Sequence, residues 1–105
     1  MINLTSKAII LIGEDRTQER FDPSGIVARI DTRYEPTGVV PGTNFPCHVR
    51  LGIVEGLPEN DEPCFVERSV FLAMNPRRAN VFTHGDGCIR YAGANDVIVT
   101  KLEGY

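Results

Sequence analysis

Apolar and polar residues alternate with a period of two along short stretches of this chain, and prolines and glycines separate the stretches. The clearest alternation begins at Ile26 and places Ile26, Ala28 and Ile30 on one side of an extended backbone. Arg29 and Arg33 fall on the other side. This pattern is typical of a strand with one buried and one solvated face. We therefore predict that the three apolar residues are buried and that the two arginines are exposed.

Proline and glycine limit how much helix the chain can form. The segment 35–46 holds three prolines and two glycines, and proline removes an amide donor that a helix interior needs. A second break rich in proline, glycine and acidic residues covers 55–63. We expect both segments to be loops, and no helix longer than about ten residues before Ser69.

The remaining stretches suit short strands, and one suits a helix. We expect strands at residues 2–12, 26–34, 49–54, 64–66, 81–82, 88–92 and 96–102. A polar turn is expected at 13–20. Ser69 is predicted to cap one short helix near Ser69–Met74, which Asn75 and Pro76 end.

Together these elements predict a mainly β fold, α+β at the margin, with residues 1–105 forming a single β-rich domain. A single small rolled sheet or barrel of about six strands is favoured, because short strands need closed edges. Apolar residues make up 42% of the chain and charged residues 24%, which suits a folded chain rather than a disordered one.

The charge balance argues against two classes of partner. Eleven basic and 14 acidic residues give a net charge of −3, so we expect no nucleic acid and no membrane partner. No apolar run approaches the roughly 20 residues of a membrane helix. The opening residues lack the basic segment and cleavage site of a secretory signal, and we expect a cytoplasmic protein.

Motifs for metal binding and common catalysis are missing from the sequence. Cys47, Cys64 and Cys88 form no C-x-x-C pair, and we expect them to be buried, reduced thiols. His48 and His84 lie far apart, without H-x-x-H or H-E-x-x-H spacing. There is also no G-x-S-x-G. We expect no metal and no cofactor.

The best candidate for chemistry is the loop 83–87, which carries His84, Asp86 and two glycines. Arg77 and Arg78 lie shortly before it. If these four residues converge, the guanidinium groups and loop amides form a small anion pocket. The alternative interpretation is a plain surface turn with solvated arginines.

Three short motifs occur in order along the chain. They are Ile2-Asn3-Leu4-Thr5, the PSGxVAR motif at 23–29 and the GxVEGLP motif at 52–58. With them the sequence resembles a group of small, uncharacterised proteins encoded by bacteria and their phages, although Ser6 and Lys7 stand where that group often has Pro-His. The resemblance implies a cytosolic protein, phage- or mobile-element-encoded, with no catalytic residues to carry over.

Two hypotheses about function follow. The first is a non-catalytic small binding protein that acts on a host protein or sequesters a small anionic ligand. The alternative is a small enzyme that acts on a phosphorylated substrate, with His84 and Asp86 as acid and base and Arg77 or Arg78 as clamp. The β-prone run 97–99 is also a candidate edge for a homodimer.

Overall fold

The computed structural model describes the whole chain, residues 1–105. It contains ten strands and one short helix. In chain order these are β1 (Ile2–Asn3), β2 (Ala8–Ile12), β3 (Gln18–Phe21), β4 (Arg29–Val39), β5 (Pro46–Glu55), β6 (Cys64–Phe65), α1 (Arg68–Ala73), β7 (Val81–His84), β8 (Ile89–Tyr91), β9 (Asp96–Val99) and β10 (Leu102–Glu103). The predicted mainly β class with one short helix is confirmed. No helix is long and apolar enough to cross a membrane.

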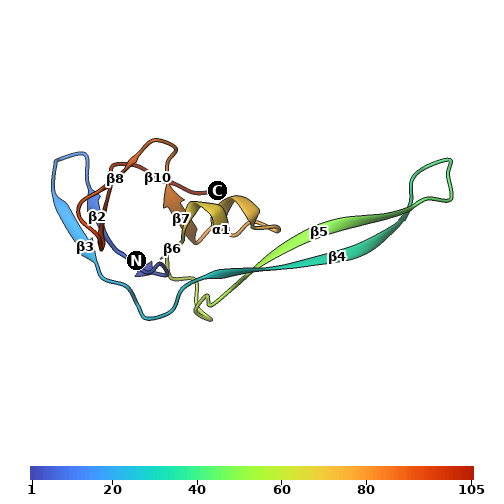
Figure 1. Ribbon diagram of the computed structural model, residues 1–105, viewed down its shortest axis with the longest axis horizontal. Helices are drawn as coiled ribbons and strands as arrows, with labels where there is room; N and C mark the ends of the chain where they lie inside the picture. Colours follow the sequence, from blue (N-terminus) through green and yellow to red (C-terminus); the bar gives the residue numbers. More distant parts are fainter.

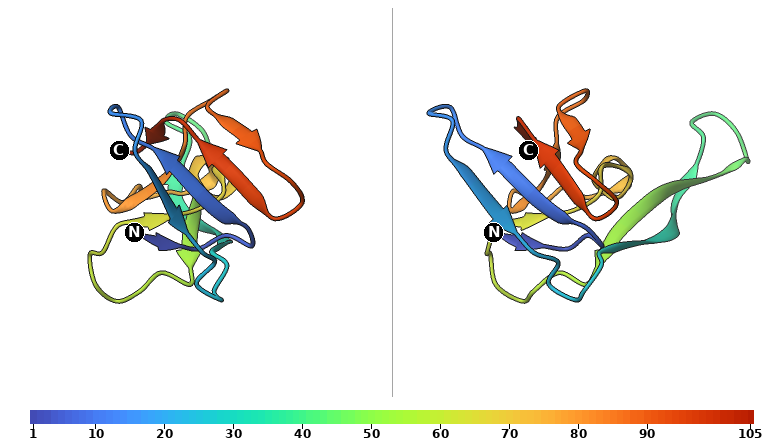
Figure 2. Two further views of the ribbon diagram at one scale, coloured as in Figure 1. Left: turned by 90° about the vertical axis from the view of Figure 1, so that its left-hand side faces the viewer. Right: turned by 60° about the vertical axis from the view of Figure 1, so that its left-hand side comes forward.

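The strands form three separate sheets rather than one rolled sheet or closed barrel. One sheet has the order β1-β6-β7-β10, the second β3-β2-β9-β8, and β4 pairs with β5 alone. Figure 2 shows the two four-stranded sheets as the body of the molecule, with the β4–β5 pair leading away from it. The pairs β1–β6, β6–β7 and β2–β9 are parallel, so the chain returns across the body between them.

The first sheet is the middle layer of the body. On β6, Cys64 packs into a cluster with Phe71 of the helix, whereas the next residue, Phe65, packs against Ile9 and Val97 of the second sheet. Successive side chains of a strand point to opposite faces, so one short strand serves both cores. Burial of a side chain such as Phe71, which is 2% exposed, contributes about 1.5–3 kcal/mol.

The helix begins one residue earlier than the sequence predicted. Glu67 occupies the N-cap position without a side-chain cap, so the prediction of Ser69 as the cap is wrong. A helix this short needs tertiary support. The ring of Tyr105 stacks on Phe71 with 4.4 Å between centroids, and its hydroxyl donates to the Phe71 carbonyl at 2.9 Å. The C-terminal residue of the chain thus holds the helix on the sheet.

The β4–β5 pair forms a long hairpin arm that projects from the body (Figure 1). With it, the molecule measures 57 × 26 × 26 Å. The prediction of a loop over 35–46 is therefore wrong at both ends, and only 40–45 form the turn. A register shift between Pro36 and Gly38 explains how a proline fits into β4, because bulges tolerate a residue without an amide donor. Gly38 has a φ of 113° there, which favours glycine.

For the alternation that begins at Ile26, the sequence correctly predicts which side is buried, but it places the start of the strand too early. Ala28 is 3% exposed and Ile30 half-buried, while Arg29 and Arg33 are exposed as predicted. The prediction for Ile26 is wrong, since it is 55% exposed. The pairing with β5 starts only at position 29, so Ile26 lies in the unpaired link between the second sheet and the arm.

Several other expected strands are divided or extended. The expected strand 2–12 is split into β1 and β2 by a turn, and the expected strand 96–102 into β9 and β10. The expected polar turn 13–20 ends earlier, because positions 18–20 pair with β2. The acidic break 55–63 is unpaired from residue 56 onward, as expected.

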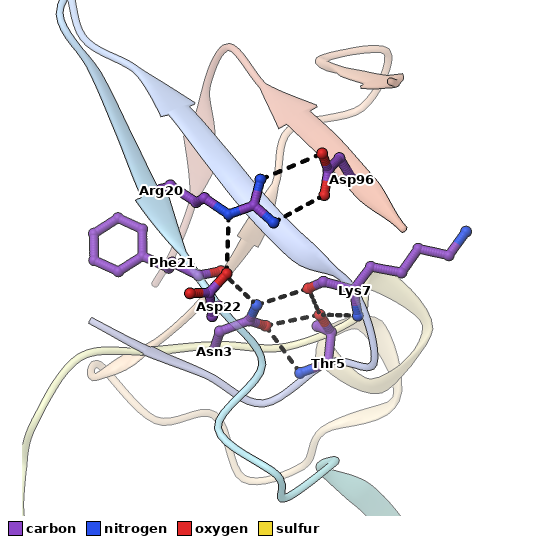
Figure 3. Close-up of polar contacts among 7 residues, drawn as sticks. All are labelled: Asn3, Thr5, Lys7, Arg20, Phe21, Asp22 and Asp96. Carbon is purple, nitrogen blue, oxygen red and sulfur yellow. Dashed lines mark hydrogen bonds and ion pairs between the residues drawn. The ribbon is translucent and has the colours of Figure 1, made fainter. Parts of the chain in front are cut away.

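A cluster of buried polar groups around Asn3 holds the turn that separates β1 from β2 (Figure 3). The Asn3 amide nitrogen donates to the carbonyl oxygens of Lys7, at 2.7 Å, and Phe21, at 3.0 Å. Its side-chain oxygen accepts from the backbone amide and the hydroxyl of Thr5. Asn3 is 2% exposed, and all its polar capacity is used. It holds the β1–β2 turn and the end of β3 together.

Figure 3 also shows a bridge across the second sheet. Arg20 on β3 pairs with Asp22 at 2.9 Å and with Asp96 at the start of β9 at 3.2 Å. Hydrogen bonding to Asp22 and Asp96 raises the pKa of Arg20, which stays charged. Exposed pairs of this kind contribute little stability, so the bridge adds little to the free energy of unfolding.

We predict that Asn3→Ala lowers the free energy of unfolding by about 2–3 kcal/mol, because it leaves buried backbone and hydroxyl groups of the turn without partners. Urea denaturation followed by circular dichroism measures the change. Asn44→Ala in the exposed arm turn is the matched control, with an expected change below about 0.5 kcal/mol. Equal effects of the two substitutions would contradict a structural role for Asn3.

Candidate functional site

The root of the arm is clamped between its own partner strand and the segment after the helix. Gly52 on β5 exchanges two backbone hydrogen bonds with Asn75, at 2.8 and 3.0 Å. The Asn75 side chain adds a bond of 2.8 Å to the Arg50 carbonyl. A Cβ on Gly52 would overlap the backbone carbonyl of Ala73, so only glycine permits this approach. The clamp fixes where the arm leaves the body.

Beyond this clamp the arm is exposed along its length. Every residue from Arg33 to Arg50 is exposed except Thr43. Large apolar side chains are nevertheless concentrated there: Tyr34 (66% exposed), Val39 (55%), Val40 (43%), Phe45 (71%) and Val49 (39%). We call Val39, Val40 and Phe45 the arm tip. Clustered exposed apolar groups of this kind mark interaction surfaces.

The arm also differs from the body in charge. Over the whole β4–β5 arm, positions 29–55, three basic residues (Arg29, Arg33 and Arg50) balance three acids (Asp31, Glu35 and Glu55), so the arm has no net charge. The net charge of −3 therefore lies in the rest of the chain. Arg33 pairs with Asp31 at 2.7 Å, whereas the Arg50 guanidinium takes part in none of the ion pairs. Arg50 is a free cation on the arm.

The structure does not bring the four residues of the expected anion pocket together. The Arg77 guanidinium lies over the Tyr105 ring, 4.3 Å from its centroid. Arg78 lines a hollow of about 610 Å³, and His84 lines a different one of about 270 Å³. Asp86 lies in the exposed turn after β7. No two of them share one of the three main hollows.

His84 faces the gap between the two body sheets. Its Nδ1 lies 3.0 Å from the Gly85 carbonyl, and Glu67 and Lys7 line the same gap. The lining includes no arginine, and His84 has no hydrogen bond to a carboxylate. The Arg68 guanidinium instead donates to the His84 carbonyl and pairs with Glu103. The Gly85 carbonyl can orient the imidazole, but no guanidinium lines this gap to clamp a phosphorylated substrate.

The hollow that Arg78 lines is an acidic groove. It runs between the segment 58–63 and the start of β7, and it has a volume of about 610 Å³. We call it the acidic groove; its lining includes Pro58, Glu59, Asp61, Pro63, Arg78 and Phe82. A small anion in this groove meets two carboxylates beside the one guanidinium, which weakens its attraction.

The expected homodimer edge at 97–99 is not an edge. Strand β9 lies between β2 and β8 in its sheet, and Val97 and Val99 are 5% and 1% exposed. Both backbone edges are occupied and both valines belong to the inter-sheet core. The β-prone run therefore builds the interior of the body instead of a contact surface.

The three thiols are free, but only one is buried. Burial raises the pKa of the Cys64 thiol. Cys88 is half-buried, and Cys47 is exposed on β5 near the arm tip. The expectation of a buried thiol is wrong for Cys47, because the segment that contains it projects into solvent instead of joining the body.

Comparisons with protein-family models, with curated proteins and with solved structures found no match.

Sequence reasoning missed the arm, which is the most exposed feature of the molecule. A signal was present: the alternation of 26–34 and that of 49–54 are both strand-like and flank one proline-rich segment. Two such runs joined by a turn predict a hairpin. The three prolines between them were interpreted as a loop, although only one lies in the turn itself.

We predict that Gly52→Ala destabilises the protein by about 3 kcal/mol, because the new methyl group meets a backbone carbonyl that a packed helix cannot move. Hydrogen exchange should show faster exchange at the amides of Gly52 and Asn75. Thr32→Ala, directly opposite on β4 and exposed, is the control and should cost less than about 1 kcal/mol. Unchanged exchange rates at the amides of positions 52 and 75 in the Gly52→Ala variant would show that the clamp does not form.

We predict a strict order of thiol alkylation, because thiolate character and exposure control cysteine reactivity. At about pH 8, iodoacetamide should modify Cys47 first and leave Cys64 intact until denaturant is added, since its raised pKa keeps the buried thiol protonated. Peptide mass spectrometry measures the order. Cys47→Ser should remove the fast phase, and rapid labelling of Cys64 in the native protein would contradict the fold.

Proposed function

We propose that this chain is a non-catalytic binding protein that engages another protein through the β4–β5 arm. The single observation that carries the proposal is the arm tip, where Val39, Val40 and Phe45 are exposed at the end of a hairpin that leaves the body. A two-stranded hairpin is marginally stable in water. Its exposed apolar tip gains stability only when another surface covers it.

The composition of the arm suits a protein surface. Aromatic residues and arginine are enriched in interface centres, and Phe45, Tyr34 and Arg50 are all exposed on the arm. Tyr34 faces Arg50 across the two strands. Three basic and three acidic residues balance along the arm, so its net charge opposes neither an acidic nor a basic partner. Exposed aromatic side chains on a projecting hairpin support protein recognition.

The expected small anionic ligand and the alternative enzyme have less support. Both depend on Arg77, Arg78, His84 and Asp86 acting together, and these residues lie in separate places. A protein partner depends on the arm alone. The proposal retains the cytoplasm as location, and the resemblance to bacterial and phage proteins supports a bacterial host protein as one class of partner.

Phe45→Ser tests the proposal, because it removes the central anchor at a position 71% exposed and without body contacts. The immobilised wild-type chain is exposed to a bacterial lysate and to a tagged copy of itself. Each retained protein is then purified and titrated by calorimetry. We expect at least a tenfold weaker affinity for the variant, as for an interface hot spot.

Leu72→Ser is the matched control, since Leu72 is 64% exposed on the helix, away from the arm tip. It should bind as the wild type does. Thermal melts should show that neither variant loses its fold. A wild-type chain that binds no protein, or a Phe45→Ser variant that binds as tightly as the control, would refute the proposal.

A further inference from the structure

We infer that the chain forms a symmetric dimer in which β4 of one copy pairs antiparallel with β4 of another. The inference rests on the proposed function, in which the arm engages protein, and names a second copy as the partner. The contact surface is the outer edge of β4 over residues 29–35, which we call the open edge. Along the arm β4 pairs only with β5, and Figure 1 shows both strands leading away from the other sheets.

The clamp at Gly52 shows which backbone groups of β4 are free. Gly52 directs its amide and its carbonyl to Asn75, and therefore away from β4. Thr32 lies opposite Gly52. In an antiparallel ladder, residue pairs that exchange backbone hydrogen bonds alternate with pairs whose groups point outward, so Thr32 also points its amide and carbonyl away from β5. The same period places the groups of Ile30 and Tyr34 on the open edge, and none of the backbone hydrogen bonds outside the sheets uses them.

A symmetry axis beside Thr32 brings these free groups into register. Thr32 of each copy then exchanges both backbone hydrogen bonds with Thr32 of the other, and Ile30 of each copy does so with Tyr34 of the other. The open edge ends at Pro36, which lacks an amide donor and precedes the register shift of β4. Pairing is therefore limited to a short stretch, and a contact between identical surfaces closes as a dimer.

The charge pattern of β4 selects this register. The side chains on one face of the strand alternate in sign, in the order Arg29, Asp31, Arg33 and Glu35. With the axis at Thr32, Arg29 faces Glu35 of the second copy, and Asp31 faces its Arg33. A slip by two residues in either direction places like charges opposite each other, which destabilises a sheet. Within one copy Asp31 accepts from the Arg33 Nε, so the other guanidinium nitrogens are left for Asp31 of the second copy.

The other face and the ends of β4 match as well. Ile30 faces Tyr34 of the second copy and Thr32 faces Thr32, and pairs of an aromatic with a β-branched residue and of two threonines favour strand pairing. The apolar residues 26–27 are exposed just before β4, and Val39 is exposed at its end. Because the start of one antiparallel strand lies beside the end of the other, these apolar side chains approach one another in the dimer.

Sedimentation velocity of the full chain from about 1 to about 300 μM tests the dimer, since this range covers micromolar self-association. We expect the wild type to dimerise. Arg33→Glu and Asp31→Arg should each weaken dimerisation at least about tenfold, because like charges then face each other on both sides of the axis. An equimolar mixture of the two variants should dimerise as the wild type does, because each acid of one chain then faces an arginine of the other.

Arg50→Glu is the matched control, because it makes the same change of charge at an exposed position on β5, away from the open edge. It should dimerise as the wild type does, and circular dichroism should show all variants folded. On dimerisation, hydrogen exchange should slow at the amides of Ile30, Thr32 and Tyr34, which are free in a single copy.

A monomeric wild type, charge variants equal to the control, mixing without recovery, or unchanged exchange at the three amides would each overturn the inference. If the wild type is monomeric yet binds a host protein through Phe45, only this inference fails. If it binds no protein at all, the proposed function fails too.

Discussion

The approach of the helix end to Gly52 determines the shape of the whole molecule. Backbone hydrogen bonds join Gly52 and Asn75, and the Ala73 carbonyl occupies the space where any other residue would place its Cβ. This contact joins β5 to the end of the helix, and Phe71 of the helix packs into the core cluster on the first sheet. Strand β5 is therefore rigid at its root and free beyond it. The arm projects because it is held at one end only.

The different roles of the body and the arm follow from the small size of the core. Only 17 of 105 residues are buried, and most of them form two clusters, of 8 and 4 residues, on opposite faces of the first sheet. Asn3 and Thr5 close the body with hydrogen bonds where apolar packing ends. The residues beyond the clamp contribute no buried side chain to either cluster. The part of the arm beyond the clamp adds nothing to the core, so its exposed apolar tip is best explained by an external contact.

The fold class was predictable from the sequence because strand periodicity is local. The phase of Ala28, Ile30 and Arg29 followed from alternation alone. The limits of strands depend on pairing, which is not local, and so Ile26 was misassigned. Pro36 was interpreted as a loop residue, yet the bulge beside it lets β4 continue. The separation of the two body sheets depends on Asn3 and on which face of the first sheet Cys64 and Phe65 point to. No rule of residue spacing reveals either.

The candidate site was harder to predict because proximity in sequence does not bring side chains together. Arg77 and Arg78 are neighbours, but one stacks on Tyr105 and the other lines the acidic groove. Side chains of adjacent residues in extended chain diverge, so a pair of arginines rarely forms one pocket. Phe45 becomes a candidate for the opposite reason, because the hairpin carries it away from the body. The exposure of this apolar anchor on a projecting hairpin is a property of the fold, and it directs the search for function toward protein partners.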